Sequence, residues 1–270
     1  MAGKEKFRFT VLADNDFYHH DNVCYTGDLE AVLSKNNVLI APMSGTDKEG
    51  YLKSTYTEKP IKLTGAQLDK IEKNTLFLIG IARQELKNSL KDNNVRLIEL
   101  ARRNDIAILN AIPTAEGAIK IAIEESPFTI FDSNILILGL GRVGLTLGWR
   151  LKALGAEVYA ATRSSGPAAR GRDLGINMLA YNELAPYLPQ IDLIFNTVPA
   201  KIITDKYIQQ LSHHCVIIDL ASSPGGTDFT AAKKKGIKAL LAPGLPGKTA
   251  PHTAGKILAE IIPGLIEEKL

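Results

Sequence analysis

The chain of 270 residues contains only two cysteines, Cys24 and Cys215. Two cysteines are too few for a disulfide framework, and neither has the Cys-x-x-Cys or histidine spacing that is typical of zinc ligands. We therefore expect two buried free thiols and no metal site.

Long apolar runs and a strong charge bias are lacking as well. No apolar run reaches the ~18 residues that span a bilayer, and the polar start Met1–Arg8 has no apolar signal-peptide core. The formal net charge is only +3, and the one lysine run, Lys233–Lys235, is typical of a solvated helix face. These absences predict a cytoplasmic protein without a nucleic-acid or membrane partner. A hydrophobic content of 45% allows one large or two medium globular domains.

The most informative feature that is present is a glycine pattern. Residues 135–144 read Ile-Leu-Ile-Leu-Gly-Leu-Gly-Arg-Val-Gly, an apolar strand that opens into Gly-x-Gly-x-x-Gly at Gly139. In this spacing the first glycine allows a tight turn, the second lets the backbone approach a pyrophosphate, and the third lets the next helix pack closely on the sheet. A helix is expected over about residues 143–154, followed by a second strand, Glu157–Ala161. This context predicts a dinucleotide site at a helix N-terminus.

The second strand lacks the acidic residue that accepts hydrogen bonds from the adenosine ribose in sites that prefer NAD. It runs instead into a Thr-Arg-Ser-Ser segment at 162–165, with Arg170 shortly after. Guanidinium and hydroxyl groups suit a 2′-phosphate, so the sequence predicts NADP(H). The segment that follows the apolar strand Ile191–Asn196 is predicted to contact the cofactor beside the nicotinamide. The predicted cofactor contacts are Gly139, Leu140, Gly141, Arg142, Val143, Gly144, Thr162, Arg163, Ser164, Ser165, Arg170, Asn196, Thr197, Val198 and Pro199.

Strand-like and helical runs alternate along the chain, which predicts an α/β fold with two doubly wound parallel-sheet domains. Residues 1–126 are expected to form a flavodoxin-like substrate and catalytic domain, including a bridging helix over 114–126 with Thr114 as its N-cap. Residues 127–270 are expected to form a Rossmann NADP-binding domain, with a C-terminal helix over about 253–262 after a Gly/Pro-rich loop. The other expected strands are Phe9–Ala13, Val38–Ala41, Leu76–Ile81, Val95–Ile98, Val216–Leu220 and Ala239–Leu241, and helices are expected over 65–72 and 83–91.

A more specific pattern lies in the loops. The segments are Asn110–Gly117, Ala161–Ser165, Asp219–Phe229, and Ala242–Gly247 with Ala250–Gly255. In this order they resemble the family of dipicolinate synthase A subunits, over nearly the whole chain from about residue 8. The resemblance implies an NADP-dependent oxidation of dihydrodipicolinate to dipicolinate (pyridine-2,6-dicarboxylate) in sporulation. It also implies that the partner is a flavoprotein-like B subunit, with FMN as that partner's candidate cofactor, and that the protein forms a homo- or hetero-oligomer.

Two departures from the family pattern stand out. Members of the family open with a leading βα unit that carries a Gly-Gly-Asp turn, whereas the first strand here, Phe9–Ala13, resembles the family's second. The resemblance therefore implies an abbreviated first domain. In addition, His252 stands where the family has a basic residue, commonly lysine, so its charge would depend on pH near neutrality.

Aromatising a dihydropyridine dicarboxylate requires a hydride acceptor, a proton acceptor and grips for two carboxylates. His252 is the best candidate for proton transfer because the unperturbed pKa of histidine, about 6.5, lies near working pH. Glu116 could act as the base or orient the base. Its presence is explained equally well by a favourable interaction between a carboxylate and the helix dipole near a helix start. The catalytic candidates are thus His252, Glu116, Thr114 and Lys248. The substrate-binding candidates are Thr114, Ser44, Gly45, Ser222, Gly225, Gly226, Lys248 and Thr253.

Two other functions compete with this one. The first is an NADP-dependent 2-hydroxy or 2-amino acid dehydrogenase of the same build. Such enzymes generally place an arginine in the second domain. No arginine occurs between Thr197 and Leu270, which counts against this function. The second is a non-catalytic NADP-binding regulatory subunit, which the abbreviated first domain keeps open.

Overall fold

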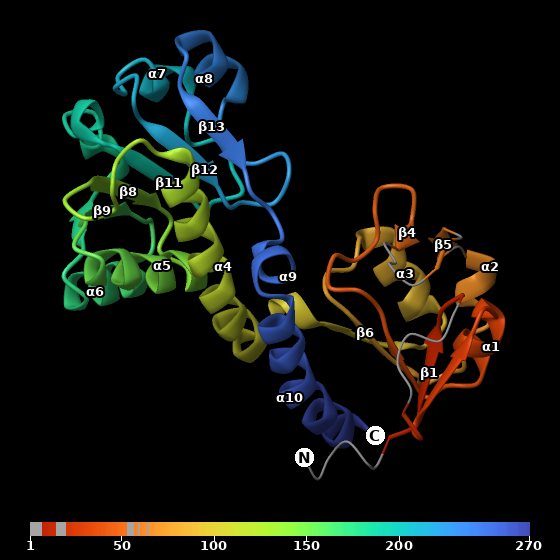
Figure 1. Cartoon of the computed structure of the whole chain (residues 1–270). Coiled ribbons are helices and arrows are strands. Elements are labelled where there is room, and N and C mark those ends of the chain that lie inside the picture. The colour runs from red at the N-terminus through yellow and green to blue at the C-terminus, as the bar shows by residue number, and fades with distance from the viewer. Residues whose placement is uncertain (1–6, 15–19, 53–56, 59, 64) are drawn as a thin grey trace. The chain divides into compact units, whose positions relative to one another are not determined.

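The computed structural model describes residues 7–14, 20–52, 57–58, 60–63 and 65–270. Contacts between backbone positions divide the chain into two compact units (Figure 1). One comprises Met1–Ala107 with Lys256–Leu270, and the other comprises Ile108–Gly255. The predicted boundary at 126/127 therefore differs from this division, as does the assignment of the C-terminal helix to the second domain.

Two helices explain the difference. α4 (Asn104–Glu125) buries its alanines at 115, 118 and 122 in the core of the second unit, so its second half belongs there. The last helix, α10 (Pro251–Lys269), buries Leu265 and Ile266 against Leu76 and Leu78 of the first unit. Because apolar burial decides which unit a helix stabilises, each helix groups with the core that covers its apolar face.

The predicted helix start at Thr114 is wrong. α4 begins ten residues earlier, and Pro113 lies inside it. The Thr114 hydroxyl donates to the carbonyl of Asn110 at 2.7 Å, which is the back-bonding of a mid-helix threonine rather than an N-cap. By length and composition α4 could cross a membrane, but 39% of its most apolar window is buried inside the structure.

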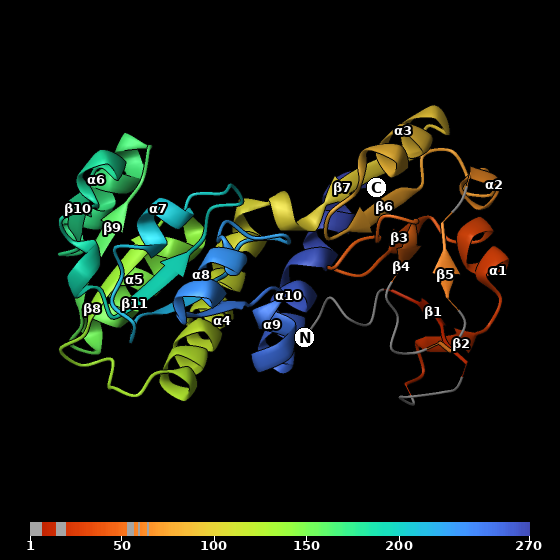
Figure 2. The same cartoon turned by 90° about the horizontal axis from the view of Figure 1, so that it is seen from above.

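The second unit is built on a six-stranded parallel sheet of order β10-β9-β8-β11-β12-β13 (Figures 1 and 2). The strands are β8 (Asn134–Leu138), β9 (Glu157–Ala161), β10 (Asn177–Leu179), β11 (Leu193–Asn196), β12 (Val216–Asp219) and β13 (Lys238–Leu241). Its other helices are α5 (Arg142–Ala153), α6 (Ser165–Asp173), α7 (Asp205–Ile208), α8 (Phe229–Lys235) and α9 (Leu245–Thr249). This is the doubly wound order, with its topological switch point between β8 and β11, where ligands bind at the carboxyl ends of the strands.

The sheet of the second unit is covered on both faces. Ile135 and Ile137 of β8 pack into one buried cluster, whereas Leu136 and Leu138 pack into another. A strand that is buried on both faces needs an unbroken apolar run, and this requirement explains why β8 shows no polar alternation. The predicted Rossmann fold is confirmed here.

The first unit has parallel strands that form separate sheets. β1 (Phe9–Leu12) pairs with β2 (Val23–Thr26), and β3 (Val38–Ile40), β6 (Leu76–Ile79) and β7 (Arg96–Glu99) form a second parallel sheet. β4 (Tyr51–Leu52) and β5 (Ile61–Lys62) form an antiparallel pair. The helices are α1 (Leu29–Ser34), α2 (Gly65–Leu68) and α3 (Gln84–Asp92). Among the described residues, β1 pairs only with β2 and β3 only with β6.

Both cysteines are free, as expected, but Cys24 is exposed. The prediction of a buried thiol is wrong there: Cys24 lies on β2, which pairs with no strand but β1 in the part of the chain that the structure describes. Cys215 is buried, and burial raises the pKa of its thiol to about 12. At neutral pH this thiol is therefore protonated and chemically inert.

Candidate dinucleotide-binding site

The glycine loop between β8 and α5 has the geometry that its sequence predicts. Gly139 adopts a positive φ of 88°, which turns the chain sharply off the strand. A Cβ on Gly144 would collide with the carbonyl oxygen of Gly139, so only glycine lets α5 pack against the loop. A Cβ on Gly141, in contrast, would meet no atom within 4 Å. The protein itself therefore does not require glycine at position 141, and the open space there suits a ligand that approaches the backbone.

The N-terminus of α5 has the features of an anion-binding site. Gly141 is its N-cap and offers no side-chain hydrogen bond to the first turn. The first intrahelical bond runs from the amide of Leu145 to the carbonyl of Gly141 at 3.0 Å. Backbone N–H groups and the positive end of the helix dipole thus face outward at the carboxyl end of β8, where a pyrophosphate can accept hydrogen bonds.

The predicted nicotinamide segment packs directly on this loop. The Thr197 hydroxyl lies 3.0 Å from the carbonyl oxygens of both Leu138 and Gly139. A Cβ on Gly139 would also lie 2.7 Å from Cγ2 of Val198. The structure therefore brings the two predicted cofactor segments together at the switch point of the sheet.

Arg163 follows β9, the strand next to β8. Its guanidinium lies over the ring of Tyr181, 5.8 Å from the ring centre, in a cation–π contact. Burial raises the pKa of Tyr181, and the charge of Arg163 partly opposes that shift. Ser164 is the N-cap of α6, and Arg170 lies in the last turn of that helix, about 8 Å along its axis from Ser165. The tyrosine thus supports the guanidinium at the strand end.

A buried carboxylate organises the next two strand ends. Asp219 ends β12, is fully buried, and accepts four hydrogen bonds. Its Oδ1 atom receives the side-chain amide of Asn196 at 3.0 Å and the backbone amide of Ala221 at 3.1 Å. Its Oδ2 atom receives the amide of Gly226 and the hydroxyl of Thr227, both at 2.7 Å. Because four donors satisfy both oxygens, the charge can stay buried while it fixes the loops after β11 and β12.

The same network explains two glycines that we predicted as substrate contacts. A Cβ on Gly225, whose φ is 87°, would lie 2.9 Å from Oδ2 of Asp219, and a Cβ on Gly226 would lie 2.5 Å from Nδ2 of Asn196. Close packing inside the protein is thus sufficient reason for both glycines. Ser222 in the same loop is exposed. Their contact with a substrate stays a prediction.

Two predicted substrate segments meet in the second unit. A Cβ on Gly117 of α4 would lie 2.7 Å from Oγ1 of Thr249 in α9, so the helices approach closely at this point. Thr249 in turn donates to the carbonyl of Leu245 at 2.6 Å. The predicted Gly/Pro-rich loop before the C-terminal helix contains the short helix α9. Lys248 lies in α9, whereas His252 and Thr253 are exposed in the first turn of α10.

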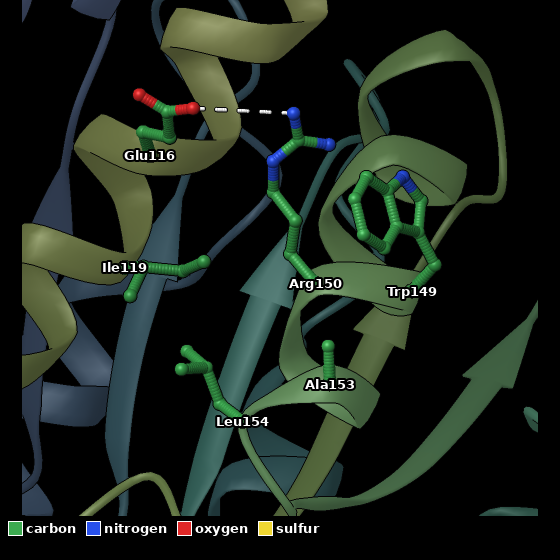
Figure 3. Close-up of a pocket in the computed structure, with 6 residues that line it drawn as sticks. All are labelled: Glu116, Ile119, Trp149, Arg150, Ala153 and Leu154. Atoms are coloured by element: carbon green, nitrogen blue, oxygen red, sulfur yellow. Dashed lines mark ion pairs between the residues drawn. The ribbon is translucent and has the colours of Figure 1, made fainter.

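Glu116 lies mid-helix, with its carboxylate 3.9 Å from a guanidinium nitrogen of Arg150 on α5 (Figure 3). Arg150 also stacks on the ring of Trp149 at 4.4 Å, and its side chain is only 17% exposed. These residues line a pocket of about 350 Å³, together with Ile119, Ala153 and Leu154. Arg150 is about 12 Å along α5 from its first residue, so this pocket is separate from the phosphate-binding end of the helix.

The remaining predicted residues, Ser44 and Gly45, belong to the first unit. Gly45 is buried with a φ of 69°, and a Cβ there would collide with the carbonyl oxygen of Ile81. This loop, which leads from β3 to β4, therefore packs on the segment after β6.

From the sequence, Asp219 was expected to end a strand and orient a neighbour, and the structure shows that this neighbour is Asn196, which ends the adjacent parallel strand in register. Two contributors were missed at the level of sequence. Tyr181 beneath Arg163 and Arg150 beside Glu116 carried no such signal, since both contacts join segments whose spacing follows no local periodicity.

Two family models match the chain in succession. The N-terminal domain of the dipicolinate synthase A subunit matches residues 7–101, and the NAD-binding domain of D-isomer specific 2-hydroxyacid dehydrogenases matches residues 114–224. The A subunit of dipicolinate synthase from Bacillus subtilis (strain 168) is 40% identical over 230 residues, which cover 85% of this chain and 77% of the relative. The chain belongs to the family of dipicolinate synthase A subunits.

Solved structures agree with this assignment. The crystal structure of the dipicolinate synthase A subunit from Bacillus halodurans superposes with a TM-score of 0.89 at 38% identity, covering 95% of this chain and 88% of that one. The structure from Bacillus subtilis gives a TM-score of 0.88 at 36% identity, with coverage of 96% and 87%. The second unit is thus a nicotinamide-cofactor domain of the dehydrogenase type, and the family confirms the predicted α/β architecture.

Proposed function

We propose that this protein oxidises dihydrodipicolinate to dipicolinate with NADP⁺ as the hydride acceptor. The observation that carries the proposal is the loop at Gly139–Gly144, whose glycines leave α5 uncapped and leave open space over Gly141. Membership in a family named for dipicolinate synthesis supplies the substrate. A ring carbon loses a hydride to the nicotinamide and a neighbouring ring atom loses a proton, so the products are dipicolinate, NADPH and H⁺.

The choice of NADP(H) over NAD(H) rests on Arg163. β9 ends without an acidic side chain, and the guanidinium held over Tyr181 can form a bidentate pair with a 2′-phosphate. Asn196–Pro199 would lie beside the nicotinamide, in the position fixed by Thr197 and Asp219. NADP(H) supplies the hydride chemistry when bound, while these residues orient it.

We assign proton transfer to His252, which is exposed at the start of α10, and carboxylate binding to Lys248 and Thr253. The Thr114 hydroxyl, predicted for the same role, donates to the carbonyl of Asn110 instead. Glu116 is an orienting group, because its carboxylate faces Arg150. His252→Ala is expected to lower kcat about tenfold or more while the NADPH dissociation constant stays within about twofold. Turnover assays and a cofactor titration measure the two quantities, and an unchanged kcat would move the proton acceptor to Glu116.

The partner that we propose is a flavoprotein-like B subunit, with FMN as its candidate cofactor, in the cytoplasm of a sporulating cell. The deciding experiment is turnover of freshly generated dihydrodipicolinate with NADP⁺, followed by NADPH absorbance with and without the B subunit. We expect dipicolinate and NADPH in equal amounts. NADPH binding without turnover under both conditions would instead favour a regulatory subunit, and turnover of a 2-hydroxy or 2-amino acid would favour the other dehydrogenase class.

A further inference from the structure

The carboxyl ends of the parallel strands β3, β6 and β7 lie side by side in the first unit (Figure 2). Hydrogen bonds join the segments that follow these strands. The amide of Gly80 donates to the carbonyl of Pro42 at 3.2 Å, and the amide of Ala101 donates to the carbonyl of Gly80 at 3.0 Å. In open parallel sheets this edge is where ligands bind. The first unit therefore has a ligand-binding edge of its own.

Arg83 follows β6 at this edge, and one side of its guanidinium is fixed by the protein. Its Nε atom donates to the carbonyl of Thr46 at 3.1 Å, and Thr46 is buried. That carbonyl belongs to the loop after β3, in which Gly45 packs on the carbonyl of Ile81. With the residues that the structure describes, the two terminal nitrogens of Arg83 form neither a hydrogen bond nor an ion pair. Two such nitrogens can donate parallel hydrogen bonds to one carboxylate.

The backbone next to Arg83 is fixed by the carboxylate of Glu99, which ends β7. Its Oε1 atom accepts from the amide of Ala82 at 3.0 Å, and its Oε2 atom lies 2.8 Å from Nζ of Lys87 and 2.9 Å from Nε of Arg102. Burial disfavours the charge of Glu99, but these three donors outweigh burial and lower its pKa. The charge of Glu99 is thus matched by Lys87 and Arg102, and the positive charge of Arg83 has no such partner in the described part of the chain.

The other arginines of the first unit are paired or lie elsewhere. Arg96 donates to backbone carbonyls from the start of β7. Arg102 and Arg103 each pair with an acidic side chain. Arg8 precedes β1, in the other parallel sheet. Arg83 is therefore the arginine at the carboxyl edge of β3, β6 and β7 that lacks an acidic partner among the described residues.

The proposed substrate, dihydrodipicolinate, has two carboxylates that need partners. The family model that matches residues 7–101 is named for dipicolinate synthase, whereas the model that matches residues 114–224 is named for NAD binding. Residues that recognise the substrate are thus expected in the first unit. We propose that Arg83 binds one of the two substrate carboxylates through its terminal nitrogens, an inference that rests on the proposed function.

The test measures the dissociation constant of dipicolinate by calorimetric titration of the full chain in saturating NADPH. Arg83→Ala should raise this constant at least about tenfold, because two charge-assisted hydrogen bonds are lost. Arg83→Lys should raise it less, since an ammonium group keeps the charge but not the planar pair of donors. Arg8→Ala is the matched control: it removes the same charge from the same unit, and the constant should stay within about twofold. The dissociation constant of NADPH should be unchanged in all three variants.

A second measurement uses the unmodified chain. Phenylglyoxal modifies accessible guanidinium groups, and mass spectrometry locates the modified arginines. Arg83 is exposed, so it should react. Saturating dipicolinate should slow its modification at least about tenfold and leave that of Arg8 unchanged. A purely structural arginine would show no such protection, so this measurement decides if Arg83→Ala fails to fold.

The remaining outcomes separate this inference from the proposed function. Dipicolinate binding that is equal in Arg83→Ala and the unmodified chain would overturn the role of Arg83 alone. The same conclusion would follow from an equal loss in Arg8→Ala, or from modification of Arg83 that dipicolinate does not slow. Failure of the unmodified chain to bind dipicolinate would overturn the proposed function and the role of Arg83 with it.

Discussion

The two units build parallel sheets from the same alternation of strands and helices, yet among the described residues only those of the second unit form one continuous sheet. There, β8 lies inside a six-stranded sheet, and its carboxyl end is fixed by Thr197 and the Asp219 network. In the first unit the parallel strands separate into a pair and a triplet. In the second unit the strand ends of β8, β11 and β12 therefore lie side by side, and hydrogen bonds join the loops that follow them.

The largest expected effect tests whether each unit depends on its own strand-to-loop glycine. A Cβ on Gly144 would collide with Gly139, and a Cβ on Gly80 of the first unit would collide with the carbonyl of Met43. Gly144→Ala and Gly80→Ala should each cost about 4 kcal/mol of unfolding free energy. Only Gly144→Ala should also abolish NADPH binding, as checked by thermal melts and calorimetric titration. Loss of NADPH binding in Gly80→Ala would show that the units are not independent.

The next effect concerns the buried network of the second unit. The buried polar side chains described in the first unit are Thr46 and Thr75, whereas the second unit buries the charge of Asp219. Asp219→Asn replaces an acceptor with a donor against its partners and should cost about 3 kcal/mol in denaturant unfolding. Asp228→Asn, an N-cap replacement in the same loop, is the matched control and should change stability little. An equal loss of unfolding free energy in the two variants would show that Asp219 does not organise these loops.

A third variant separates ligand binding from stability. Gly141→Ala adds a methyl group where the protein has open space, so the melting temperature should stay near that of the unmodified chain. NADPH affinity should fall about 100-fold, or about 2.7 kcal/mol, because the methyl group occupies the position of the pyrophosphate. Calorimetric titration measures the NADPH dissociation constant, and an unaltered constant would mean that the dinucleotide does not approach position 141.

The smallest effect concerns cofactor choice. Arg163→Ala should weaken NADPH binding about tenfold and leave NADH binding nearly unchanged, since only the 2′-phosphate loses its partner. Tyr181→Phe is the control, because a phenyl ring preserves the cation–π support of the guanidinium. A similar loss for both cofactors would place Arg163 at a phosphate that they share.

The sequence predicted the β8–α5–β9 segment to within a residue or two because its signals are local: an apolar run, three glycines and a stop at Gly155. Local signals misled at Thr114, where a threonine ahead of an apolar helical pattern is typical of an N-cap but here lies within α4. The split sheet of the first unit could not be predicted, since strand pairing depends on residues distant in the chain. The support of Arg163 by Tyr181 escaped prediction for the same reason.

The most direct measurement of the central claim is a side-by-side calorimetric titration of the unmodified protein with NADPH and NADH at one ionic strength. We expect both to bind, with NADPH at least about tenfold tighter, because the amides of the glycine loop hold the pyrophosphate of each and Arg163 adds a contact to the 2′-phosphate. Equal affinities would contradict the role of Arg163, and failure of both to bind would contradict the account of the loop itself.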